Sequence, residues 1–333
     1  MKKYLIIFLL CSATTLLFTA HFVFAVGTVI DEHSAALRLS EQLEENLETS
    51  PLNLKVRRLT LEGSQVSSEF ASNLLMLISH ELKSNKDDFP SVGELTRGLT
   101  RGGLTILPNP DDDPQAQDAF LEGTYRKVGE QVVVQLRLVA EDGTSVSRGE
   151  VSIPVSGVKH ELLPPNLLLV QKVEKMSAQS EVPAPKDFAI ELGLNKADGA
   201  VFREGEELKI YFRSEEDCYL LLWYQDVVGN HYILYPETET QRKTKLKAGI
   251  NHKLPKNFNL EVSCDPACGA EIVWAFASTK PIQMSGSVDD LHGSGLRGYP
   301  ASVSLENILG QQRAIKRRTK KAEAMVYLTT VKK

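Results

Sequence analysis

The chain has 333 residues, of which 42% are hydrophobic and 24% are charged, and its formal net charge is −5. These values are ordinary for a globular protein, and a chain of this length can bury the cores of two domains. The mild acidity argues against a dedicated nucleic-acid binder, so nucleic acid is not expected as a partner.

The N-terminus has the pattern of a secretory signal peptide. Lys2 and Lys3 precede an almost entirely apolar run from Tyr4 to Phe24, which ends at the small residue Ala25. This pattern predicts cleavage after Ala25 and export to the periplasm or the cell envelope. The apolar run is also long enough to remain as a membrane anchor, and that alternative stays open.

Residues 26–176 are predicted to form an α+β domain with a mainly antiparallel sheet and two helices. Helical and alternating apolar spacings distinguish its elements, and Asp142-Gly143 is a strong hairpin turn between the last two strands. The expected elements in chain order are a helix at 34–47, a strand at 54–61, a helix at 67–82 and strands at 120–127, 132–138 and 145–155.

The stretch 177–185 is small, polar and proline-containing, which predicts a linker to a second domain at 186–333. Short apolar runs separated by turns predict that this domain is mainly β and sandwich-like, with one late helix. The expected elements are strands at 208–212, 218–224, 231–235, 258–262 and 272–277, a helix at about 305–320 and a final strand at 325–331.

Three cysteines lie in the second domain. Pro266 forces a turn between Cys264 and Cys268, so a structural disulfide between them is expected in an exported protein. Cys218 lies in an apolar run and is expected to pack as a small hydrophobic residue. No second Cys or His pair has zinc spacing, and no metal or other cofactor is expected.

The densest charge cluster lies near the C-terminus. It is predicted to be an interaction patch for an anionic lipid, a cell-wall polymer or an acidic partner. The alternative is a solvated helix end that the helix dipole stabilises. Its members are Lys316, Arg317, Arg318, Lys320 and Lys321.

Short motifs follow one another in a fixed order through the second domain: Phe202–Leu208, Asp217–Leu220, Asp226–Gly229, Leu234–Pro236, Leu246–Gly249 and Ala275–Ser278. Together they resemble a bacterial family catalogued as domain of unknown function 4384. The resemblance covers roughly residues 186–333. It implies a protein that is exported or fused to other modules, with no known catalytic residue.

The first domain combines the strand–helix pair at 54–82 with Gly123–Tyr125, Gly129, Val132–Leu138 and the Asp142-Gly143 turn. This order resembles envelope-assembly proteins such as the flagellar outer-membrane protein O family and the curli-secretion and penicillin-binding-protein-activator lipoproteins. The resemblance implies protein partners in an envelope assembly or secretion system.

No nucleophile elbow, P-loop or zinc helix occurs in the sequence, and a Ser-His-Asp hydrolase would need a convergent pocket of distant residues. We therefore expect a non-catalytic interaction or assembly protein of the bacterial cell envelope. The alternative is an extracytoplasmic sensor or ligand-binding module whose second domain grips a glycan or peptide. An aromatic-lined groove would favour the alternative, and a closed apolar core would favour the assembly protein. The aromatic residues concerned are Tyr219, Trp223, Tyr224, Tyr232 and Tyr235.

Overall fold

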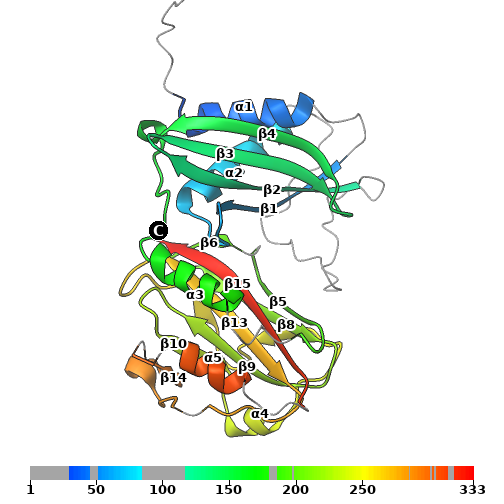
Figure 1. Cartoon of the computed structure of the whole chain (residues 1–333), viewed down its shortest axis with the longest axis vertical. Helices are drawn as coiled ribbons and strands as arrows, with labels where there is room; N and C mark the ends of the chain where they lie inside the picture. The colour runs from blue at the N-terminus through cyan, green and yellow to red at the C-terminus, as the bar shows by residue number, and fades with distance from the viewer. Residues whose placement is uncertain are drawn as a thin grey trace, which may run out of the picture.

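The computed structural model contains an α+β N-terminal domain and a β-rich C-terminal domain, which confirms the predicted fold class (Figure 1). The signal cleavage site at Ala25, linker residues 180–185 and the basic residues 316–318 lie outside the described residues. Within the described part, no helix is long and apolar enough to cross a bilayer. The described residues are 30–45, 52–84, 117–179, 186–196, 199–284, 286–300, 302–303, 305–313 and 319–333.

The N-terminal domain is a four-stranded sheet in the order β1-β2-β3-β4. β2, β3 and β4 form antiparallel neighbours, whereas β1 and β2 run parallel, and α2 lies in the long connection that parallel strands require. The elements are α1 (Glu32–Glu45), β1 (Leu52–Leu61), α2 (Glu69–Ser84), β2 (Gln117–Val128), β3 (Gln131–Ala140) and β4 (Ser145–Pro154), followed by the 3₁₀ turn η1 (Val155–Gly157).

Both helices cover the same side of this sheet (Figure 1). Leu39 of α1 and Phe70 of α2 are fully buried against strand residues such as Leu121 and Val134. Burial alternates along β3 and β4, because successive side chains of a strand point to opposite faces. In the described part of the chain, no helix packs on the opposite face, where polar residues predominate and Phe120 and Val139 are buried.

A buried carboxylate at the start of α1 ties the two helices together. Glu32 is 3% exposed, and its Oε2 accepts a hydrogen bond from Asn73 Nδ2 of α2 at 2.7 Å. Its Oε1 accepts from the backbone N–H groups of Lys159 and His160 at 2.7 and 3.1 Å. The carboxylate therefore fixes α1 to α2 and to the chain that follows β4.

The C-terminal domain packs a six-stranded sheet, β14-β10-β9-β13-β15-β6, against the smaller sheets β11-β8-β5 and β12-β7. The other side of the six-stranded sheet is covered by α3 and α5, so β13 is buried at every position (Figure 1). The elements are α3 (Leu167–Gln179), β5 (Ile190–Leu194), β6 (Ala200–Arg203), β7 (Glu207–Leu208), β8 (Ile210–Ser214), β9 (Tyr219–Gln225), β10 (His231–Tyr235), α4 (Glu239–Lys243), β11 (His252–Leu254), β12 (Leu260–Glu261), β13 (Ala270–Ser278), η2 (Leu291–Gly293), β14 (Gly298–Tyr299), α5 (Leu305–Arg313) and β15 (Lys321–Val331).

Helix α3 was not predicted. Its first residues, Leu167–Val170, are all apolar, which conceals a helical period, and its buried residues Val170 and Val173 pack on the six-stranded sheet. The helix includes residues 177–179, which were predicted to belong to the linker. The domain boundaries themselves stay a prediction.

The predicted basic patch is wrong at Lys321. β15 begins at Lys321 rather than at residue 325, and the Lys321 side chain is buried instead of exposed. Its Nζ donates to the backbone oxygen of Arg313 at 2.6 Å, where a cation stabilises the carbonyl end of α5. Arg313 and Glu323 form a buried ion pair, with Nη2 2.8 Å from Oε1, which joins α5 to β15.

The two domains meet at the loop between β1 and α2, residues 62–68. Oε1 of Glu174 in α3 accepts hydrogen bonds from Ser64 Oγ at 2.9 Å and from the Gln65 backbone N–H at 2.7 Å. Thr329 Oγ1 of β15 donates to the backbone oxygen of Ser67 at 2.9 Å. The same loop therefore contacts α3 and the final strand of the C-terminal domain.

Cys264 and Cys268 lie at disulfide-bonding distance, with their Cα atoms 4.4 Å apart, as the sequence predicted. Cys218 is free and buried. We predict that denatured, non-reduced protein lacking residues 1–25 contains a single titratable thiol, that of Cys218, and that reduction exposes the other two. Three free thiols before reduction would contradict the disulfide.

The contact of Glu174 with the loop at 62–68 predicts a graded response to substitution. Glu174→Ala leaves the Ser64 hydroxyl and the Gln65 N–H without their acceptor, and we expect it to lower the free energy of unfolding by about 1–2 kcal/mol. Glu174→Gln keeps an oxygen that can accept both bonds, so its loss is expected to be smaller. Urea unfolding of the three proteins measures the difference, and an alanine variant as stable as the parent would show that the contact contributes nothing.

Candidate functional site

The face of the N-terminal sheet that no described helix covers carries polar side chains at alternate positions. Along β2, Leu121 and Tyr125 are buried in the core with the helices. Glu122 and Thr124 alternate with them and therefore point to the other face. We call this face the open face.

The strand register brings charged residues of all four strands into one line across the open face. Arg58 of β1 lies opposite Glu122 of β2, Glu122 lies opposite Arg137 of β3, and Arg137 lies opposite Arg148 of β4. We call these four residues the charged row. Nothing in the sequence analysis singled them out.

One carboxylate of the charged row faces two arginines. Arg137 donates to Glu122 Oε1 from Nη2 at 2.7 Å and from Nε at 3.1 Å. Oε2 of the same carboxylate is 3.4 Å from Nη1 of Arg57, whose guanidinium lies 3.7 Å from the centre of the Phe120 ring. The carboxylate of Glu122 is therefore already paired with two arginines of this domain.

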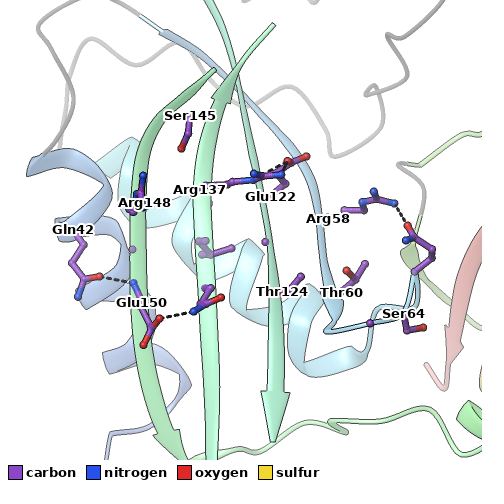
Figure 2. A pocket seen from close by; sticks show the side chains of 16 residues that line it. Gln42, Arg58, Thr60, Ser64, Glu122, Thr124, Arg137, Ser145, Arg148 and Glu150 are labelled. Atoms are coloured by element: carbon purple, nitrogen blue, oxygen red, sulfur yellow. Dashed lines mark hydrogen bonds and ion pairs between the residues drawn. The ribbon is translucent and has the colours of Figure 1, made fainter. Parts of the chain in front are cut away.

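Arg148 is exposed, and no described residue forms an ion pair or hydrogen bond with its side chain. It stands directly opposite Arg137 on the neighbouring strand, and like charges in opposed positions destabilise a sheet. Figure 2 shows Arg148 beside the Arg137–Glu122 pair. Folding alone gives no reason for a second arginine at this position.

The charged row lies in an open hollow of about 760 Å³ on this face. The β1–α2 loop borders it at one end, where Arg58 Nη1 donates to Gln65 Oε1 at 2.6 Å. Gln135 and Glu150 are joined across β3 and β4 by a 2.6 Å hydrogen bond (Figure 2). The lining residues are Gln42, Arg58, Thr60, Gly63, Ser64, Gln65, Glu122, Gly123, Thr124, Gln135, Leu136, Arg137, Ser145, Arg148, Gly149 and Glu150.

This lining has the chemistry of a binding surface. Its described residues hold three arginines and two glutamates with hydroxyl and amide groups between them, and include no histidine, cysteine or aromatic ring. Across the described residues, no group of three or more His, Cys, Asp or Glu side chains is placed to hold a metal ion. The hollow can therefore recognise a charged partner through ion pairs and hydrogen bonds.

Of the five aromatic residues proposed for a ligand groove, Trp223 and Tyr235 are buried inside the C-terminal domain, whereas Tyr219, Tyr224 and Tyr232 are half-buried. Trp223 is 1% exposed and stacks on Trp274 with ring centres 5.3 Å apart, on the side of the sheet that α3 covers. Tyr235 is 2% exposed and belongs to the core between the sheets. These two rings therefore lie on opposite sides of the sheet and do not share a surface.

Two members of the predicted basic patch are described. Lys320 is exposed and pairs with Glu216 at 2.6 Å, whereas Lys321 is buried, as described above. An interaction patch of Lys316, Arg317, Arg318 and Lys320 stays a prediction.

Two buried groups with displaced pKa values lie in the C-terminal domain, away from the hollow. Burial raises the pKa of Glu271 on β13 to about 8, although a hydrogen bond from the Tyr224 hydroxyl opposes the shift. Burial lowers the pKa of His231 on β10 to about 4. Glu271 is therefore mostly protonated and His231 neutral at neutral pH.

The profile of a family described as "Domain of unknown function (DUF4384)" matches residues 201–281. The predicted resemblance is thus confirmed for this segment, which runs from β6 to β13. No curated protein and no solved structure matches the chain. The resemblance of the first domain to envelope-assembly proteins stays a prediction.

Motif residues in the matched segment build turns. Asp226 Oδ1 accepts from the backbone N–H groups of Val228 and Asn230 at 3.0 and 2.8 Å, and Gly229 has φ +92°, so together they close the β9–β10 hairpin. Asp217 accepts from Lys247 Nζ at 2.8 Å and from a backbone N–H at 2.9 Å. The hollow lies outside the segment that the family profile matches.

The raised pKa of Glu271 predicts a pH-dependent stability. Between about pH 5 and pH 8 the unfolded carboxyl is ionised while the folded one stays largely protonated, so stability falls as the pH rises. Because of this residue, we expect the free energy of unfolding to fall by about 3 kcal/mol over that range. Glu271→Gln removes the titration, so the variant should gain stability relative to the parent as the pH rises. Urea unfolding of the parent and the variant at about pH 5 and pH 8 measures the change in the free energy of unfolding. The same change in both proteins would contradict the prediction.

Proposed function

We propose that this protein is an exported, non-catalytic interaction protein of the bacterial cell envelope, and that the open face of its N-terminal sheet is the surface that binds a partner. The observation that carries the proposal is the charged row. Arg148 has no partner among the described residues, and it lies beside Arg137 in a hollow of about 760 Å³. A partner that engages these charges would compensate the repulsion that the fold leaves in place.

The signal-peptide pattern supports export, and a disulfide is compatible with an oxidising compartment. The partner we propose is a protein of an envelope assembly or secretion system. The C-terminal domain serves as a scaffold, held to the hollow through the contacts of Glu174 and Thr329 with the loop at 62–68.

The alternative, a sensor that grips a glycan or peptide with the aromatic residues of its C-terminal domain, has less support. Such a site needs exposed rings on a shared surface. Trp223 and Tyr235 are buried on opposite sides of one sheet, and the cross-strand neighbours Tyr224 and Tyr232 are half-buried against the core between the sheets.

Photo-crosslinking in cells tests the proposal. A photoreactive amino acid replaces Ser145, which is exposed and lines the hollow, and in a matched variant it replaces Arg38, which is exposed on α1 on the opposite side of the sheet. We expect a discrete crosslinked protein in the envelope fraction from position 145 and none from position 38. Adducts that are absent at position 145, or the same at both positions, would contradict the proposal.

A further inference from the structure

We infer that the hollow on the open face binds an acidic peptide segment of the partner protein. This inference rests on the proposed function and adds the chemistry of the ligand. Among the described residues, three arginines line the hollow against two glutamates, and Arg57 adds a fourth cation beside Glu122. The surplus of cations selects for carboxylates.

Arg137 and Arg148 form the centre of this site. They occupy directly opposed positions of β3 and β4, so one ligand carboxylate can lie between their guanidinium groups. Arginine donates hydrogen bonds in a planar fork that matches the two oxygens of a carboxylate. Glu122 holds the Arg137 guanidinium through Nη2 and Nε, which orients it before a ligand arrives.

The remaining lining favours a peptide over other anionic ligands. Glu122 and Glu150 lie among the arginines and need hydrogen-bond donors beside them, which the backbone N–H groups of a peptide supply and a polyphosphate chain lacks. Thr60, Thr124 and Gln135 supply hydrogen bonds for its backbone. None of the lining residues that the structure describes has an aromatic ring on which a sugar could stack.

Fluorescence anisotropy with the full mature chain tests the inference. The probe is a fluorescein-labelled poly-L-glutamate peptide at low ionic strength, compared with a poly-L-lysine peptide. Arg148→Gln is the informative variant, since it breaks no contact with a described residue, and Arg38→Gln is the control because it removes the same charge from the opposite side of the domain. Thermal unfolding verifies that both variants fold.

We expect poly-L-glutamate to bind, poly-L-lysine not to bind, and added salt to weaken binding. Arg148→Gln should weaken it about tenfold, the effect of losing one charged hydrogen-bonding group, and Arg38→Gln should leave it unchanged. Equal affinities of the two variants would overturn the inference. So would inorganic polyphosphate or phosphatidylglycerol vesicles that bind the parent more tightly than the peptide does. If poly-L-glutamate fails to bind while Ser145 still crosslinks a partner in cells, the acidic ligand is wrong and the proposed function stands.

Discussion

The parallel pairing of β1 with β2 is the constraint on which the N-terminal domain depends. Parallel neighbours need a long crossover, and α2 lies in that connection on the side of the sheet where α1 also packs. With both helices on one side, most apolar residues of the strands turn toward them, and the polar alternate residues face away, together with Phe120 and Val139. The charged row thus follows from the same alternation of side chains that places the apolar residues in the core.

The β1–α2 loop joins the hollow to the C-terminal domain. Arg58 of the charged row donates to the side chain of Gln65, and the backbone N–H of Gln65 donates to Glu174 of α3. Helix α3 packs in turn on the six-stranded sheet of the C-terminal domain. A ligand that draws Arg58 away from Gln65 would therefore act on the loop that fixes the two domains, which connects binding to domain arrangement by direct contacts.

Much of the fold follows from local patterns in the sequence, because helical and alternating spacings depend only on neighbouring residues. The two N-terminal helices, the β2–β3–β4 hairpins and the disulfide were predicted in this way. Helix α3 was missed because its initial apolar run hides the helical period. Lys321 was misplaced because a cluster of basic residues does not show where a strand begins. The hollow was not predicted: Arg58 is distant in sequence from Glu122, Arg137 and Arg148, and only the strand register aligns the four residues.

The most direct test of the account is arginine footprinting with phenylglyoxal, followed by mass spectrometry of the modified peptides. The exposure of Arg148 and Arg38 to the reagent is compared between purified protein and protein in intact envelopes. The account predicts that Arg148 becomes protected in the envelope while Arg38, on the other side of the sheet, stays reactive. Equal reactivity of Arg148 in both preparations would show that the open face has no partner there and would contradict the central claim.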